Sequence, residues 1–270
     1  MRPSRGPRAA AVLLLSALAL VGSVASQGCA GSPSDAKAPA TTSPAPETPP
    51  SETVFRIQPI RPIDEVRREA LAAEPPVEEG LEAPDLVELA PLDPTIRLDI
   101  RYATTNNFLG TKLYDEPRAF LQRPAAEALL RAHRALAKSG WGLLIHDAYR
   151  PWYVTKMFWD ATPEDKHTFV ANPAKGSRHN RGCAVDLTLY ELATGKVAEM
   201  PSAYDEMSDR ARPDYAGGTP EQRRLRDHLR AAMEAEGFAV YEVEWWHFDY
   251  KDWKRYPVGN VTFDKIGPQR

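Results

Sequence analysis

Short stretches in which apolar and polar side chains alternate predict β-strands along the last two thirds of the chain. In one of them, Ile96, Leu98 and Ile100 fall on one face and the intervening residues on the other. Two further stretches are short apolar runs of the length that strands usually have. The predicted strands cover residues 95–102, 141–146, 183–189 and 238–243.

Apolar side chains spaced three and four residues apart predict amphipathic helices between these strands. The best marked helix opens with the capping box Thr219-Pro-Glu-Gln222 and is closed by Gly237. Its apolar stripe comprises Leu225, Leu229 and Met233. Two more helices are predicted from Arg123 to Gly140 and from Pro151 onward, and residues 63–73 allow a short one.

The first 28 residues have the composition of an export signal. Residues 1–8 carry three arginines and no acidic residue, and the apolar run 9–20 is too short for a comfortable membrane span. The order Ser-Gln-Gly-Cys29 resembles the lipobox of bacterial lipoproteins, although a leucine is usual where Ser26 stands. We therefore expect an exported protein, periplasmic or at the cell surface, that is anchored to the membrane by a lipid on Cys29. The alternative is simple cleavage of the leader and release as a soluble protein.

Residues 29–90 are predicted to be a disordered linker that starts at the lipid anchor. Of the 25 prolines in the chain, 13 lie between Pro33 and Pro94. Residues 30–50 have almost no apolar bulk, so they cannot bury enough surface to offset the loss of chain entropy. Residues 91–270 are of ordinary size for one folded domain with a single core.

Charge and cysteine content exclude several classes of protein. The formal net charge is −3, and it falls to −6 (31 basic against 37 acidic residues) when the leader and its three arginines are removed. We expect no nucleic-acid partner, because an acidic chain without a basic stripe repels phosphate. The two cysteines are Cys29 and Cys183, which cannot pair with each other if Cys29 is lipidated. Cys183 is then expected to be a small buried residue. The oligomeric state is not predicted.

Two short stretches carry the residues that are typical of metal-dependent chemistry. They read Ser-Arg-His-Asn-Arg-Gly-Cys-Ala-Val-Asp and Glu-Trp-Trp-His-Phe, at residues 177–186 and 244–248. A catalytic zinc site needs three protein ligands, an open position and a base for the water. We interpret His179, Asp186 and His247 as the ligands of one Zn²⁺ ion and Glu244 as the base.

The spacing of these residues requires two departures from regular secondary structure. A straight helix would separate His179 from Asp186 by about 10 Å along its axis, and a straight strand would place them on opposite faces. A bend is therefore needed, and Gly182 allows it because glycine readily adopts positive φ. A regular strand would likewise separate Glu244 from His247, so we expect a bulge or turn through the two tryptophans between them. These tryptophans are expected to wall the site or to belong to the core, and the two roles are compatible.

The order Ser-x-His-x-x-Gly-x-Ala-x-Asp followed by Glu-x-x-His resembles the zinc D-Ala-D-Ala dipeptidases, the VanX-type branch of the D-Ala-D-Ala metallopeptidases. The similarity extends from about Leu92 to Lys265. The resemblance implies an α+β fold in which helices pack on a mostly antiparallel sheet that carries the zinc site, as in the hedgehog-like relatives. It also implies that the substrate is a small D-amino-acid dipeptide. Three further stretches agree with this branch, at residues 99–110, 147–151 and 204–207.

The resemblance also assigns roles to residues outside the metal site. Arg150, at a predicted strand-to-helix turn, is implied to stabilise the oxyanion of the reaction. Asp205, helped by Asp147, is implied to hold the free ammonium group of the substrate, which would exclude acylated amines. The residues alone also allow structural roles. Arg150 could instead form a surface ion pair, and Asp205 could instead cap a helix or belong to a turn. The remaining candidate substrate contacts are Asn107, Tyr114 and Ser177.

Three functions are consistent with these motifs. The first is a dipeptidase that cleaves free D-Ala-D-Ala, and the second is a D,D- or L,D-carboxypeptidase that trims peptidoglycan peptides. The third is a zinc-binding cell-wall module without catalysis. The stretch at residues 99–110 and the Asp-x-x-Arg at residues 147–150 favour the first function, and Glu244 argues against the third. The remaining histidines are expected to be ordinary surface or core residues: His133, His146, His167 and His228.

Overall fold

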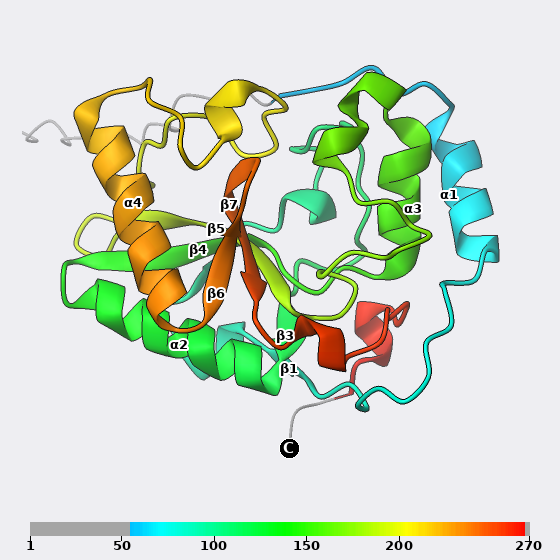
Figure 1. Cartoon of the computed structure of the whole chain (residues 1–270), viewed down its shortest axis with the longest axis horizontal. Helices are drawn as coiled ribbons and strands as arrows, with labels where there is room; N and C mark the ends of the chain where they lie inside the picture. Colours follow the sequence, from blue (N-terminus) through cyan, green and yellow to red (C-terminus); the bar gives the residue numbers. More distant parts are fainter. Residues whose placement is uncertain (1–54, 268–270) are drawn as a thin grey trace, which may run out of the picture. The chain divides into compact units, whose positions relative to one another are not determined.

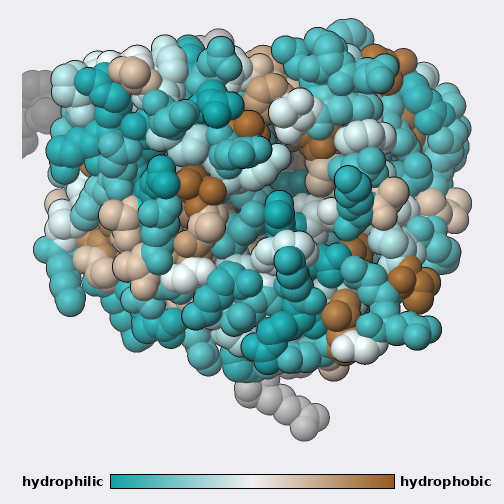
Figure 2. Space-filling model, viewed as in Figure 1, coloured by the Kyte–Doolittle hydropathy of each residue, from teal (hydrophilic) through white to brown (hydrophobic). Residues whose placement is uncertain are grey.

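The computed structural model describes residues 55–267 of the 270-residue chain, and these belong to one compact unit. The predicted signal peptide, the lipid on Cys29 and the first part of the predicted linker lie outside the described residues and stay predictions. Across residues 55–267, none of the helices has the length and apolar character needed to cross a membrane. Figure 2 shows a mainly hydrophilic face, on which apolar side chains form small separate patches.

A five-stranded mixed sheet runs through the centre of the domain in the order β2-β4-β5-β7-β6 (Figure 1). β2 and β4 are parallel, whereas the pairs β4–β5, β5–β7 and β7–β6 are antiparallel. The prediction of an α+β fold with a mostly antiparallel sheet is therefore confirmed. The strands are β2 (Arg97–Leu98), β4 (Trp141–Asp147), β5 (Ala184–Glu191), β6 (Phe238–Tyr241) and β7 (Glu244–Tyr250).

The three predicted helices are present, and two of them pack against the sheet. α2 packs against β4 and against α4, and α4 packs against β6. The capping box of α4 is formed, since Gln222 N–H donates to Thr219 Oγ1 at 3.1 Å and Thr219 N–H donates to Gln222 Oε1 at 2.9 Å. In Figure 1 α4 lies on the left, α2 runs along the bottom of the domain, and α3 lies on the right. The helices are α2 (Arg123–Ala137), α3 (Trp152–Ala161) and α4 (Pro220–Ala235).

Two predicted strands are shorter than their sequence pattern suggests. β2 has only two residues, and a 3₁₀ turn at Arg101–Ala103 follows it, so the strand predicted for residues 95–102 is wrong over most of its length. Ile96 and Ile100 are still buried in the core, and Leu98 packs against the core partly buried. The last predicted strand ends at Tyr241, and a two-residue turn precedes β7. Glu244 therefore begins a new antiparallel strand.

The prediction of a disordered linker up to residue 90 is wrong for the described part, in which the short helix that the sequence allowed at residues 63–73 is formed. Residues Ile63–Ala72 form α1, which packs against α3 and fully buries Val66 and Ala70. Residues Leu86–Glu88 form β1, which pairs with β3 (Phe120–Gln122) in a second, two-stranded sheet. A few apolar side chains suffice in this Pro- and Glu-rich region, because they dock on a core that the rest of the chain supplies.

Replacing Val66 with alanine is expected to lower the free energy of unfolding by about 1–2 kcal/mol, because two buried methyl groups are lost. Leu71, in the same helix, is 56% exposed, so Leu71→Ala is expected to change the stability by less than about 0.5 kcal/mol. Urea denaturation of both variants measures the difference. Equal, negligible effects would mean that α1 does not belong to the cooperative fold.

Candidate active site

The backbone brings the three predicted metal ligands together. β5 and β7 are paired with Asp186 directly opposite His247. His179 lies in the loop before β5, where consecutive turns end at Gly182, whose φ is +66°. This is the bend that the spacing required. The loop is docked on the β4–α3 turn, because Arg150 N–H donates to the carbonyl of His179 at 3.1 Å.

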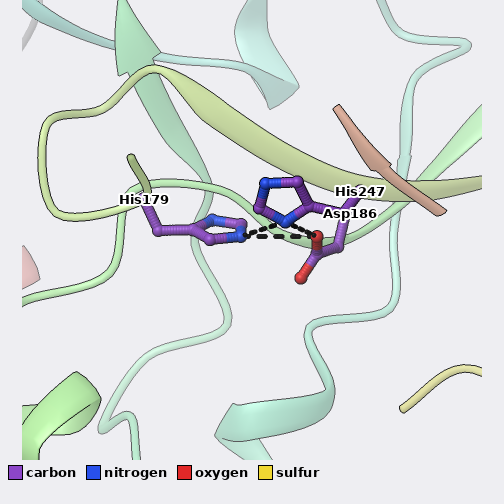
Figure 3. A group of neighbouring side chains, drawn as sticks. All are labelled: His179, Asp186 and His247. Atoms are coloured by element: carbon purple, nitrogen blue, oxygen red, sulfur yellow. Dashed lines mark hydrogen bonds and ion pairs between the residues drawn. The ribbon is translucent and has the colours of Figure 1, made fainter. Parts of the chain in front are cut away.

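Three ligand atoms from these residues form a nearly equilateral triangle (Figure 3). Nε2 of His179 lies 3.1 Å from Nδ1 of His247 and 3.3 Å from Oδ1 of Asp186. The third edge, from Nδ1 of His247 to Oδ1 of Asp186, is 3.0 Å. Tetrahedral coordination with bonds of about 2.0–2.1 Å places ligand atoms about 3.3 Å apart. The triangle therefore has the size that one zinc ion needs, with a fourth position open.

Hydrogen bonds behind the imidazoles direct their lone pairs to the same point. Nδ1 of His179 donates to the carbonyl of Ala148 at 2.6 Å, so Nε2 of the neutral ring carries no proton. Nε2 of His247 donates to Oδ1 of Asp249 at 2.9 Å, which leaves the lone pair on Nδ1. Oδ1 of Asp186 is buried without a hydrogen-bond partner. Three buried electron-rich atoms that face one another repel each other, and a cation between them would remove this cost.

Without a metal ion, the same arrangement attracts a proton. Burial lowers the pKa of His247, but the carboxylates of Asp249 and Asp186 outweigh it and raise this pKa to about 10. Burial also raises the pKa of Asp186, yet the imidazoles of His179 and His247 hold it well below its ordinary value. A proton and a metal ion therefore compete for Nδ1 of His247.

Glu244 lies beside the triangle because β7 is bulged. Val240 of β6 is opposite Phe248, whereas the next residue, Tyr241, is opposite Glu244, so the three residues between Glu244 and Phe248 are extra. The predicted bulge is thus confirmed. It leaves Oε2 of Glu244 3.9 Å from Nδ1 of His247. Burial raises the pKa of Glu244 to about 8, with the charge of His247 opposing this rise.

Arg150 lies in the turn between β4 and α3 and is held by a buried carboxylate. Its Nε and Nη2 both donate to Oδ2 of Asp147, at 2.8 and 2.7 Å. The Tyr114 hydroxyl donates to the other oxygen of Asp147 at 2.7 Å. Nη2 of Arg150 also lies 3.6 Å from Oδ2 of Asp186. The guanidinium is therefore fixed next to the three ligand atoms of His179, Asp186 and His247, which we call the metal triangle.

Asp205 reaches the site from the loop between β5 and α4. It has a φ of 60°, and among the described residues it is the one non-glycine residue with positive φ. Such a conformation is costly and often occurs at functional sites. The Tyr102 hydroxyl lies 3.0 and 3.1 Å from the two carboxylate oxygens of Asp205. The Tyr204 hydroxyl lies 3.1 Å from that of Tyr102 and 3.0 Å from Oδ2 of Asp186, which links Asp205 to the metal triangle.

These groups surround one cavity of about 300 Å³, which suits a small ligand. Ser177 also lies on its wall, and its Oγ accepts the N–H of His179 at 3.2 Å. Of the two tryptophans, Trp246 lines the cavity, whereas Trp245 is buried and donates to Oγ of Ser202 at 2.9 Å. The predicted site residues on the wall are Arg150, Ser177, His179, Asp186, Asp205, Glu244 and His247.

Three predicted substrate contacts do not lie on the cavity wall. The Asn107 amide donates to the carbonyls of Thr104 and Thr111, both at 2.8 Å, so it braces its own loop. Asp147 is fully buried and accepts hydrogen bonds from Tyr114 and Arg150. The polar atoms of Asn107, Tyr114 and Asp147 are therefore already hydrogen bonded to protein groups. They support the residues that line the cavity and do not line it themselves.

The sequence analysis missed three residues of the site. Asp249 orients His247, and its position two residues further along the same strand was the available signal. Tyr102 and Tyr204 lie in stretches that resemble the family, but their contacts with Asp205 and Asp186 exist only in the folded chain. The other predictions for cysteine and histidine are confirmed: Cys183 is buried, His133 is buried in the core, and His146, His167 and His228 bond or stack with protein groups.

Comparisons with known proteins identify the family of the chain. Residues 82–265 match the peptidase M15 family, described as D-ala-D-ala dipeptidase. The chain is 34% identical over 174 residues to the D-alanyl-D-alanine dipeptidase of Escherichia coli K12, covering 64% of this chain and 89% of that protein. It is 37% identical over 187 residues to the D-alanyl-D-alanine dipeptidase of Enterococcus faecium, covering 63% and 91%. For the Streptomyces coelicolor protein of the same name the identity is 36% over 175 residues, covering 58% and 87%. The chain therefore belongs to the peptidase M15 family of D-Ala-D-Ala dipeptidases and is a peptidase.

Proposed function

We propose that this chain is a zinc-dependent dipeptidase that hydrolyses D-Ala-D-Ala, with one Zn²⁺ held by His179, Asp186 and His247. The observation that supports this most strongly is the triangle of ligand atoms with edges of 3.0–3.3 Å. Its oxygen, Oδ1 of Asp186, is buried without a hydrogen-bond donor. Such an atom is costly in the absence of a cation.

When bound, zinc lowers the pKa of a water molecule and polarises the peptide carbonyl of the substrate. Glu244 takes a proton from the attacking water and passes it to the leaving amine. Arg150 donates to the oxygen that becomes negatively charged, and its hydrogen bonds to Asp147 keep the guanidinium in place before the substrate arrives. Trp246 on the cavity wall helps to exclude bulk water.

We assign the free ammonium group of the dipeptide to Asp205. Burial raises the pKa of Asp205 well above its ordinary value, and the charges of Asp186 and Glu244 act in the same direction. A cationic group next to Asp205 would compensate for both effects. An amine that is already acylated carries no positive charge and has a larger volume, so the same carboxylate disfavours longer peptides. The small cavity supports this restriction to dipeptides.

We also propose that the protein acts outside the cytoplasm, because residues 1–28 have the composition of an export leader. A lipid on Cys29 would then tether the domain to the membrane. Mass spectrometry of the mature N-terminus distinguishes an acylated Cys29 from a leader that is simply cleaved.

The decisive experiment compares the hydrolysis of D-Ala-D-Ala with that of N-acetyl-D-Ala-D-Ala. We expect kcat/KM for the acetylated dipeptide to be lower by at least about 100-fold, because this substrate leaves the buried Asp205 without a cationic partner. Asp205→Asn is expected to reduce the ratio of kcat/KM between the free and the acetylated dipeptide, mainly by lowering kcat/KM for the free dipeptide. Comparable rates on both substrates would instead support a carboxypeptidase, and no turnover of either would leave no support for a dipeptidase.

A further inference from the structure

The segment that follows α1 crosses the loop that carries His179. In Figure 1 it runs from α1 along the lower edge of the domain toward β1. Glu78 in this segment accepts two hydrogen bonds from Arg181, from Nη2 to Oε1 at 2.7 Å and from Nη1 to Oε2 at 3.0 Å. Oε2 also accepts the N–H of Val258 at 3.0 Å. Glu78 therefore ties together two segments that are far apart in the sequence.

Arg181 is buried, so its positive charge is stabilised by the carboxylate of Glu78 more than by water. The exposed fraction of its side chain is 8%, whereas that of Glu78 is 30%. Nη1 of Arg181 also donates to the carbonyl of Tyr256 at 2.5 Å, and the guanidinium faces the ring of Trp253. Burial raises the pKa of Glu78, but the hydrogen bonds from Arg181 and Val258 outweigh it and hold this pKa below its ordinary value. The pair is thus an ionised, two-pronged contact.

Arg181 lies two residues after His179 in the same series of turns. Gly182 N–H donates to the carbonyl of His179 at 3.0 Å, and the carbonyl of Arg181 accepts Nε2 of Gln122 at 2.9 Å. Arg181 also lies on the wall of the active-site cavity. Without its counter-charge the guanidinium loses two of its hydrogen bonds and is free to turn toward this cavity. That movement would shift the loop from which His179 reaches the metal triangle.

We propose that Glu78 is a positioning residue of the metal site, which acts through Arg181 to hold His179 in place. The matched region of the family begins at residue 82, so the segment upstream of that region supplies this residue. The inference rests on the proposed metal-dependent function. Partners that orient metal ligands typically change metal affinity or activity by about 10–100-fold when they are replaced.

The test measures the release of zinc from the holoenzyme to a chromophoric chelator, together with kcat and KM for D-Ala-D-Ala. Glu78→Gln is expected to weaken zinc binding by about 10–100-fold. Glu82→Gln is a matched control in the same segment, because Glu82 pairs with Arg255 at 2.6 Å but both side chains are about half exposed, at 49% and 51%. We expect Glu82→Gln to leave the zinc affinity unchanged.

A double-mutant cycle separates a positioning role from a general loss of stability. In an Arg181→Gln background, Glu78→Gln is expected to have no further effect on zinc affinity, because the two residues act as one unit. If Glu78→Gln does not fold, Arg181→Lys keeps the charge but loses the two-pronged contact, and about a 10-fold weakening is then expected.

Several results would overturn the proposal. The first is a Glu78→Gln variant whose zinc affinity is unchanged and whose melting temperature alone is lower. The second is an equal loss of zinc affinity in Glu82→Gln. The third is a cycle in which the effects of Glu78 and Arg181 on zinc affinity are independent. These outcomes differ from a failure of the proposed function. In that case the wild-type protein itself would retain no zinc and hydrolyse no dipeptide.

Discussion

Replacing Glu244 with glutamine is expected to lower kcat for D-Ala-D-Ala by about 10²–10⁴-fold, while the zinc content of the purified protein stays unchanged. Glutamine has nearly the same shape as glutamate and can still hydrogen bond to water, but it cannot accept a proton. The three ligand atoms belong to other residues, so the metal triangle is retained. Steady-state kinetics and metal analysis on the same preparation measure the two expectations together.

Glu242 is the matched control for this experiment. It lies two residues before Glu244 in the turn between β6 and β7, and it is exposed. We expect Glu242→Gln to keep wild-type kcat, because it removes the same charge from the hairpin without touching the cavity. Full activity in Glu244→Gln would mean that another group accepts the proton. Loss of zinc in that variant would show instead that Glu244 contributes to metal binding.

Replacing Arg150 with lysine is expected to lower kcat by about 10²–10³-fold, as the loss of one oxyanion donor does in other hydrolases. Lysine keeps the positive charge but cannot reproduce the planar donors that now bind Asp147 through Nε and Nη2. The remaining ammonium group is expected to stay with the buried Asp147 and to leave the oxyanion unassisted. KM for D-Ala-D-Ala is expected to change less than kcat, because the oxyanion exists only in the transition state.

Arg118 offers a control with the same chemistry away from the cavity. Its Nε and Nη2 donate to the two carboxylate oxygens of Glu88 at 2.9 and 2.8 Å. Arg118→Lys is therefore expected to affect stability slightly and kcat not at all. A wild-type kcat in Arg150→Lys would remove Arg150 from the reaction and leave it a purely structural partner of Asp147.

The local elements of this fold were predictable from the sequence because their signals are local. Helix α4 is bounded by a capping box and a glycine, and both boundaries depend on residues within a few positions of each other. The bend at Gly182 and the bulge in β7 followed from the requirement that residues at unsuitable spacings meet at one ion. The four residues assigned to the metal site could be named for the same reason.

Predictions failed where burial depends on distant parts of the chain. Residues 63–72 were assigned to the linker although their sequence allows a short helix, and it is packing against α3 that accompanies the burial of Val66 and Ala70. Asn107 and Tyr114 were predicted to contact substrate, but the Asn107 amide braces its own loop and the Tyr114 hydroxyl donates to Asp147. Sequence spacing carries no information about the contact between Tyr114 and Asp147, since the fold brings these two residues together.

The sequence by itself determined which side chains can bind a metal ion and which can accept a proton, because those are properties of residue types in a specific order. Only the tertiary structure decided which groups hydrogen bond to these side chains. They are Asp249 for His247, Tyr204 for Asp186 and Asp147 for Arg150. These contacts need distances of about 3 Å, which depend on the strand geometry of β7 for Asp249, on the turn after β4 for Asp147 and on the packing of a separate loop for Tyr204. Hydrogen bonding acts only at such short range, so it exists only once the backbone has closed around the site.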